Sequence, residues 1–375
     1  MLSSAPYLRA LALAFLAVAP AFCAEKLVLL GTYGFGPGIG FSLAHFDDET
    51  GRLTRPDFIT AARNPGFFAI QSDGRHLYAC NEISPGEVSA YRLEAATGRL
   101  TRLNTRSSAG LGPAYISLDR SGRFALVANY GSGTIAVFAI NPDGSLGKQT
   151  AFVQHSGRSV DPVRQTHAYA HSIIVDPSNR FVLVADLGTD KVFIYRLDAS
   201  DGGLSPNEPA FAAVAPGSGP RHISFHPNGR WVYVVNEMAS TVAAFTWDPE
   251  AGSLAPFQTI STLPADFHGK STAAEIDVHP NGKFLFSSNR GFDSIAVFSI
   301  DPATGRLAPV EIVPSGGRTP RFFTLDPGAR WLLCANQDSN NVVVFGIDPS
   351  TGHLSRAGDP VAAHVPVCLG FLPRQ

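Results

Sequence analysis

Six side chains that could act together on an ester occupy matching places in an internal repeat of this sequence. The set consists of His171, Arg221, Glu237, Glu275, Arg290 and Arg321. Guanidinium groups bind carboxylate or phosphate through paired hydrogen bonds, and they stabilise the oxyanion that forms when water attacks an ester carbonyl. A glutamate or a histidine can take the proton from that water. These residue types therefore suit the addition of water to an ester or a lactone.

A repeat of about fifty residues places these side chains. Each copy has an apolar run, a turn of the Pro/Asp-x-Gly-Arg kind, and a second apolar run that ends in Asn or Asp. The basic residues of the turns follow one another at intervals of 47 to 57 residues: Arg75, Arg123, Arg180, Arg230, Lys283 and Arg330. Two β-rich runs around such a turn form a hairpin, and a third strand and a turn into a fourth strand follow. The period and the strand content predict the four-stranded antiparallel blades of a β-propeller.

The two ends of the chain supply one more blade. Residues 26–32 match the second strand of a copy, and residues 48–53 match its turn from the third strand to the fourth. Residues 366–373 match a first strand. We therefore expect an all-β, seven-bladed propeller, closed by the C-terminal strand joining the N-terminal blade so that no strand edge stays open.

Positions that differ between the copies of the repeat are candidates for the functional site, whereas positions that the copies share belong to the scaffold. The positions nine and eight residues before the basic residue, and seven after it, should surround one mouth of the central channel. Sister copies carry Gly, Ala, Phe or Leu at the positions of the charged set, so the fold does not require those charges. The same rim should carry further candidate substrate-binding residues, namely His222, Asn236, Asn289 and Cys368. The structural alternative is that some of these side chains form ion pairs that lock neighbouring blades.

The first 24 residues do not belong to the repeat. Arg9 precedes an apolar run over residues 10–19, and small residues surround Cys23, which is the pattern of a secretory signal peptide. The run is short for a membrane span, so we expect no stable membrane insertion after cleavage. The sequence thus predicts a signal peptide over residues 1–24 and a single propeller domain over residues 25–375, in an exported protein of the periplasm or the medium. If the signal is misread, the protein is cytoplasmic.

The composition and net charge of the chain limit the classes of binding partner that we expect. The 375 residues carry a formal net charge of −2, and the basic residues are scattered along the chain, which gives no sign of nucleic-acid binding. We expect no cofactor and no metal site, because His167 and His171 have a ligand-like spacing only on a helix and lie in a strand region. The oligomeric state is left open. The expected partner is a small molecule.

Seven segments resemble the bacterial lactonase family of seven-bladed propellers, which includes the propeller-type 6-phosphogluconolactonase and the fungal carboxymuconate cyclase. The segments are residues 169–172, 219–222, 236–237, 273–275, 289–291, 319–321 and 366–368. The resemblance spans residues 26–373. It implies a metal-independent hydrolase that opens a sugar δ-lactone to the aldonate by water attack in the channel mouth. By motif, the family's catalytic residues fall on His171, Arg221, Glu237 and Arg290.

Two departures from the family pattern leave alternatives open. Tyr169 stands where the family usually has a first histidine, and His167 lies two residues upstream. The phosphorylated lactone of the cytosol also does not fit an export signal, so the substrate is either phosphorylated and cytosolic or unphosphorylated and outside the cytoplasm. A carboxymuconate-type cycloisomerase and a non-catalytic exported propeller that binds a ligand at the same mouth are the competing hypotheses.

Overall fold

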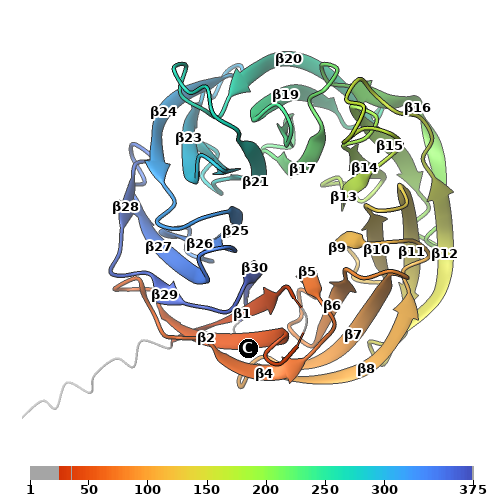
Figure 1. The fold of residues 1–375 in the computed structure, drawn as a ribbon. Helices are drawn as coiled ribbons and strands as arrows, with labels where there is room; N and C mark the ends of the chain where they lie inside the picture. The colour runs from red at the N-terminus through yellow and green to blue at the C-terminus, as the bar shows by residue number, and fades with distance from the viewer. Residues whose placement is uncertain (1–24, 35, 374–375) are drawn as a thin grey trace, which may run out of the picture.

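The computed structural model describes residues 25–34 and 36–373, which form a closed ring of seven blades (Figure 1). Each blade is an antiparallel sheet that runs from the centre of the ring to its rim. The predicted all-β, seven-bladed propeller is therefore confirmed. The predicted signal peptide, residues 1–24, lies outside the described residues.

The strands occupy four positions in each blade. The inner strands line the centre: β5 (Pro65–Ile70), β9 (Pro113–Leu118), β13 (Ala170–Val175), β17 (Pro220–Phe225), β21 (Thr272–Val278), β25 (Pro320–Leu325) and β30 (Pro366–Phe371). The second strands are β6 (His76–Asn81), β10 (Phe124–Asn129), β14 (Phe181–Asp186), β18 (Trp231–Asn236), β22 (Phe284–Arg290), β26 (Trp331–Asn336) and β1 (Lys26–Thr32). The third strands are β7 (Glu87–Glu94), β11 (Thr134–Ile140), β15 (Lys191–Leu197), β19 (Thr241–Asp248), β23 (Ser294–Ile300), β27 (Asn341–Ile347) and β2 (Gly40–Asp47).

Five blades have one continuous outer strand, and two have it in two pieces. The continuous ones are β8 (Arg99–Ser107), β12 (Leu146–Gln154), β16 (Leu204–Ala213), β20 (Ser253–Ser261) and β24 (Leu307–Pro314). The divided ones are β28 (Leu354–Arg356) with β29 (Val361–Ala362), and β3 (Arg52–Leu53) with β4 (Asp57–Ala61). The divided outer strands belong to the last blade and the first blade, which meet where the ring closes.

The ring closes by pairing the last strand of the chain with the first. β30 lies antiparallel to β1, with Leu369 opposite Leu30. A buried ion pair supports the same seam: Nζ of Lys26 lies 2.7 Å from Oδ2 of Asp48 and 2.9 Å from Oδ2 of Asp326. Lys26 and Asp48 belong to the first blade, whereas Asp326 follows β25 in the last one. The predicted sharing of one blade by the two chain ends is confirmed.

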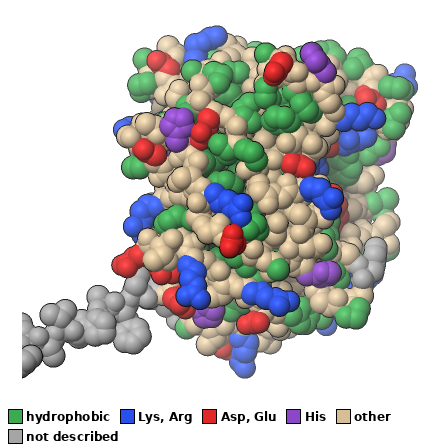
Figure 2. Space-filling view, turned by 60° about the vertical axis from the view of Figure 1, so that its left-hand side comes forward, with side chains coloured by type: hydrophobic (Ala, Val, Ile, Leu, Met, Phe, Trp, Pro, Cys, Tyr) green, Lys and Arg blue, Asp and Glu red, His purple; other side chains and the backbone are tan. Residues whose placement is uncertain are grey.

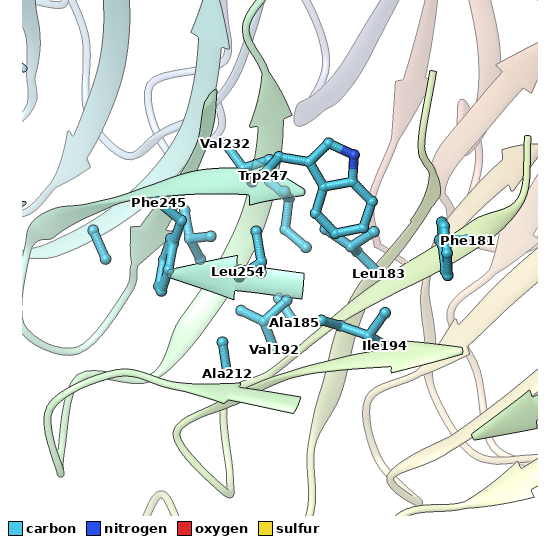
Figure 3. Packing of buried hydrophobic residues seen from close by; sticks show 13 residues of the cluster. Phe181, Leu183, Ala185, Val192, Ile194, Ala212, Val232, Phe245, Trp247 and Leu254 are labelled. Atoms are coloured by element: carbon cyan, nitrogen blue, oxygen red, sulfur yellow. The ribbon is translucent and has the colours of Figure 1, made fainter. Parts of the chain in front are cut away.

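Apolar side chains fill the space between neighbouring blades. Figure 3 shows one such cluster, in which Phe181 and Leu183 of β14 pack with Phe245 and Trp247 of β19. The ring of Trp247 meets that of Phe181 edge to face, with centroids 5.7 Å apart. Edge-to-face contact is a favoured geometry for aromatic pairs. These clusters fix the angle between adjacent blades and so the position of every inner strand.

The turn from third to fourth strand also contacts the preceding blade. Gly305 has a φ of 72°, and a Cβ on it would lie 2.4 Å from the ring of Trp231. Gly252 makes the same close approach to Phe181. Only glycine meets both demands, a left-handed backbone and contact with an aromatic face. The recurrent Gly of the repeat is thus a packing residue between blades.

The outer surface mixes both signs of charge. In the face seen in Figure 2, Lys and Arg side chains alternate with Asp and Glu among apolar and neutral groups, without a patch of one sign. In residues 25–34 and 36–373, no helix has the length and apolar character needed to cross a bilayer.

Replacement of Lys26 by Met should weaken the closure of the ring. Asp326 is fully buried and would lose its cationic partner, and breaking a buried pair on one side costs about 3–5 kcal/mol. Urea unfolding would measure the loss. Lys148→Met, at an exposed lysine of β12, is the matched control. Equal stability of the two variants would contradict a closing role for Lys26.

Candidate active site

Every inner strand begins with a β-bulge. In the pairing of β17 with β18, Pro220 lies opposite Asn236 and His222 opposite Val235, so that Arg221 is an extra residue without a partner. The same shift occurs at the start of five other inner strands, and in β21 a shift between Ala273 and Ile276 leaves Ala274 and Glu275 without paired residues. The extra residues are Gly66, Ala114, His171, Arg221, Ala274, Arg321 and Val367. Bulges re-aim a side chain without breaking the rest of the ladder, so these positions can vary freely.

Glu237 is the centre of an ion-pair cluster at the mouth. Its Oε2 lies 2.8 Å from Nη2 of Arg290 and 3.3 Å from Nε of Arg221. Its Oε1 lies 2.5 Å from Nη2 of Arg164. The carboxylate is only 6% exposed, so three guanidinium groups surround one buried anion. The structure thus brings Arg221, Glu237 and Arg290 together, as predicted.

The backbone holds this cluster in place. The N–H of Glu237, just after β18, donates to the carbonyl of Gly219 at 2.7 Å. Its own carbonyl accepts from the N–H of Ala273, the second residue of β21, which is the inner strand of the next blade. Arg290 at the end of β22 donates from Nη2 to the same Ala273 at 3.2 Å. The charged groups therefore sit on a frame that spans two blades.

Two effects of opposite sign act on the pKa of Glu237. Burial raises the pKa of this carboxyl, but Arg290, Arg221 and Arg164 together outweigh it and lower the pKa to about 2. The group is an ionised carboxylate at any physiological pH. It is also a weaker base than an ordinary glutamate as long as all three arginines contact it.

Two histidines lie beside this cluster, and both are uncharged. Burial, with Arg221 next to it, lowers the pKa of His171 well below its usual value, and the same causes lower the pKa of His222. The two rings are 5.2 Å apart. Nδ1 of His171 is buried and has no hydrogen-bond partner among the residues described. A neutral imidazole with an unused ring nitrogen can hold a water or a substrate hydroxyl.

His222 joins the mouth to a buried carboxyl. Its Nδ1 lies 2.9 Å from Oε1 of Glu275, and both side chains are less than a tenth exposed. Burial raises the pKa of Glu275 to about 8, so that near neutrality this group holds its proton. Two hydrogen bonds steady it: its N–H donates to Oγ of Ser288, and its Oε1 accepts from the N–H of Ile276. Glu275 is therefore a neutral support for His222 rather than a second anion.

Aromatic rings form a floor under the mouth. Phe67 stacks on Tyr115 with centroids 4.1 Å apart, and His222 meets Tyr115 edge to face at 5.0 Å. Phe322 contacts Phe67 from the opposite side at 5.7 Å. These rings come from four inner strands, β5, β9, β17 and β25. Rings from four of the seven blades thus meet in the channel beside the charged groups, and the mouth lined by these groups and rings is called the cup.

Arg321 lies in a separate part of the rim. Its Nη2 donates to the hydroxyl of Tyr33 at 3.0 Å and lies 3.9 Å from Oε2 of Glu82. Tyr33, Glu82 and Gln337 line a cavity of about 370 Å³ beside it. Arg321 does not contact Glu237 directly. It supplies positive charge to the wall of the cup.

The remaining predicted positions are buried and bonded within the scaffold. Nδ2 of Asn236 donates to Oγ1 of Thr241 at 3.0 Å. Nδ2 of Asn289 donates to the carbonyl of Thr262, and its Oδ1 accepts from the hydroxyl of the same residue. Cys368 is 1% exposed in an apolar cluster, and burial raises the pKa of its thiol. The surroundings of Asn289 and Cys368 give no support to their predicted contact with substrate, whereas Oδ1 of Asn236 is buried without a hydrogen-bond partner among the residues described.

Tyr169, at the place of the family's first histidine, lies among rings. Its ring contacts His167 at 3.9 Å and Tyr130 at 4.9 Å, and Tyr130 in turn contacts His171 at 5.4 Å. His167 is exposed, with Nε2 3.4 Å from the carbonyl of Gly131. Among the residues described, no group of three or more His, Cys, Asp or Glu side chains could hold a metal ion.

Arg164 is a residue of the site that the sequence did not predict. It lies in the segment 155–169 between β12 and β13, outside the strands that the repeat aligns. One signal pointed to this segment, because it lies in the longest of the five intervals between basic turn residues, the 57 residues from Arg123 to Arg180. An insertion of this kind on the rim of a propeller is a place where function concentrates.

Replacement of Glu275 by Gln should change the pH dependence of stability. The folded protein keeps the proton of Glu275 up to a pH of about 8, whereas the unfolded chain releases it near 4.5. Between these values the folded state binds more protons, so this group makes the wild type less stable as pH rises. Urea unfolding across this range should show the variant gaining stability relative to wild type toward high pH. Parallel curves would show that Glu275 is ionised in the folded protein.

Known proteins match this chain over the whole ring. The model of a family described as "Lactonase, 7-bladed beta-propeller" matches residues 27–371. A 6-phosphogluconolactonase of Bacillus subtilis is 36% identical over 344 residues, which cover 92% of this chain and 97% of that protein. A 6-phosphogluconolactonase of Formosa agariphila is 32% identical over 77% of this chain and 83% of its own length. The solved structure of a periplasmic gluconolactonase of Pseudomonas aeruginosa superposes with a TM-score of 0.88 and 33% identity, over 93% of this chain and 99% of that one.

Proposed function

This chain belongs to the lactonase family of seven-bladed β-propellers, and from that premise we propose that it opens a sugar δ-lactone to the aldonate by water attack in the mouth of the ring. As an enzyme it is a lactone-hydrolysing carboxylic ester hydrolase. Within this class we propose 6-phosphogluconolactonase-like activity, without a metal ion. The substrate is a small molecule that enters the cup from the solvent.

The three guanidinium groups on one buried carboxylate carry this proposal. Arg164, Arg221 and Arg290 bring three positive charges to the single negative charge of Glu237. Arg321 adds a fourth cation on the rim, against Glu82. An excess of positive charge in a half-buried cup favours an anionic substrate and an anionic transition state. A phosphorylated lactone, which is attacked to give a tetrahedral oxyanion, meets both conditions.

The reaction assigns a role to each catalytic residue predicted from the sequence. The lactone carbonyl lies against Arg221 and Arg290, whose guanidinium groups stabilise the oxyanion that forms. Glu237 takes a proton from the attacking water as the oxygen of that water bonds to the carbonyl carbon. The bond from this carbon to the ring oxygen then breaks, and the proton passes from Glu237 to the released alkoxide. His171, uncharged and with an unused Nδ1, orients the water.

Export is part of the proposal. The segment 1–24 has the pattern of a signal peptide, and the Pseudomonas aeruginosa relative is a periplasmic gluconolactonase. An exported enzyme would meet its lactone in the periplasm or in the medium. Both the phosphorylated and the unphosphorylated sugar lactone therefore belong in the test.

A panel of substrates tests the function. Mature protein would be assayed for hydrolysis of glucono-δ-lactone, its 6-phosphate and other lactones, each against the spontaneous rate, and for turnover of a carboxylated muconate. Hydrolysis of a sugar lactone well above background is the expected result. Muconate turnover alone would indicate a cycloisomerase. Tight binding of an aldonate without any turnover would indicate a binding protein.

Replacement of Glu237 by Gln should lower kcat by at least about a hundredfold, the low end for loss of a general base. Glutamine keeps the size of the side chain but cannot accept the proton. Steady-state kinetics on the best lactone of the panel would measure the effect. Glu250→Gln, at an exposed glutamate of the outer surface, is the control. Unchanged turnover in the Glu237 variant would remove this residue from the proposed chemistry.

A further inference from the structure

Arg164 reaches the mouth from the segment 155–169. Hydrogen bonds hold this segment on both sides of an exposed residue. Oδ1 of Asp161 accepts hydrogen bonds from the N–H groups of Val163 and Arg164, both at 2.8 Å. Gln165 is fully buried and donates from Nε2 to the carbonyl of Leu187 at 2.8 Å. Val163, between them, is 76% exposed. The segment therefore holds the backbone of Arg164 in place while its side chain extends over the cup.

Arg164 differs from the two other arginines on Glu237 in its exposure to solvent. Its side chain is 40% exposed, compared with 3% for Arg221 and 15% for Arg290. Its second contact is a weak one, 3.4 Å from the hydroxyl of Tyr130. When Arg164 leaves, its guanidinium needs little further desolvation or repacking, and the buried Glu237 keeps the ion pairs with Arg221 and Arg290. Of these three arginines, Arg164 is thus the one that can exchange partners at the lowest cost.

The two oxygens of Glu237 are used differently. Oε2 contacts the buried Arg221 and Arg290, and Oε1 contacts the half-exposed Arg164. Arg164 therefore covers Oε1, the oxygen through which a water could reach the base. The reaction proposed above requires that oxygen to be uncovered.

We propose that Arg164 leaves Oε1 of Glu237 to bind an anionic group of the substrate, a phosphate or a carboxylate, and so uncovers the base only when such a group is present. The inference rests on the proposed function of Glu237. A guanidinium binds a phosphate or a carboxylate through paired charge-assisted hydrogen bonds, so one ion pair is exchanged for another. The substrate is then recognised and the water-activating oxygen is released in the same movement.

The electrostatics act in the same direction. Arg164 is one of the cations that hold the pKa of Glu237 down, so its departure raises the pKa of that carboxyl and makes it a stronger base. A neutral lactone offers no partner to Arg164 and leaves the ion pair closed. An anionic lactone should therefore have the higher kcat, and not only the lower KM.

Two substrates and three variants test this exchange. Arg164→Gln and Arg164→Lys would be compared with wild type and with Arg158→Gln, at an exposed arginine of the same segment. Kinetics would be measured on glucono-δ-lactone 6-phosphate and on unphosphorylated glucono-δ-lactone. For the phosphorylated lactone, Arg164→Gln should lower kcat/KM by at least about tenfold, the lower end for loss of a charged hydrogen bond. For the neutral lactone the same variant should have a higher kcat than wild type, because the base is no longer covered.

Other readouts separate this role from a structural one. In Arg164→Gln the acid limb of the kcat/KM profile should move to higher pH, because Glu237 has lost a neighbouring cation. Arg164→Lys should restore part of the activity on the phosphorylated lactone. Equal losses of activity on both lactones, or a change in KM without a change in kcat, would contradict the proposal that Arg164 moves from Glu237 to the anionic group of the substrate.

A second experiment tests Arg164 even if the protein does not hydrolyse sugar lactones. If wild type hydrolyses neither lactone, that function falls, and calorimetric binding of 6-phosphogluconate and of gluconate tests Arg164 directly. Weaker binding of 6-phosphogluconate in Arg164→Gln supports anion recognition by this residue, and a larger loss for 6-phosphogluconate than for gluconate identifies the phosphate as the group that it binds. Equal binding by both proteins overturns it.

Discussion

The pairing of β30 with β1 is the constraint on which the rest of the molecule depends. Each blade has one face against each neighbour, so the angle between blades is fixed only if the ring has no free edge. Lys26 strengthens this seam through its buried ion pairs with the first and last blades. The closed arrangement of the seven inner strands around the centre depends on that pairing (Figure 1).

The repeat was enough to predict the ring, the split blade and the rim on which Arg221, Glu237 and Arg290 meet. Each of these follows from a pattern that recurs along the chain, because the hairpin, its turn and its apolar faces are local. Arg164 could not be predicted in this way. It lies outside the repeat, and its contact with Glu237 depends on the fold of a segment held by Asp161 and Gln165 rather than on any periodicity. The bulges were missed for a similar reason, since an extra residue in one strand is visible only against its partner.

The mouth keeps charged and uncharged polar groups apart. Exposed and buried arginines surround the ionised Glu237, whereas His171, His222 and Glu275 beside this cluster are uncharged. Aromatic rings from several blades meet in the same channel. Charge is thus confined to groups that pair with one another, and the other buried polar groups are uncharged, which limits the cost of burying them. The apolar clusters between blades consist of other residues, so packing of the blades and chemistry at the mouth do not compete for the same side chains.

The strand that closes the ring, β30, is also the last strand of the chain to be synthesised. Tyr33, among the first residues of the ring, contacts Arg321, which begins the inner strand of the last blade. A growing chain holds all the catalytic residues proposed above before residues 366–371 exist, yet it has no closed mouth to place them in. The cup is complete only when the final strand has been added to the first. An unfinished chain therefore carries the residues of the site without being able to use them.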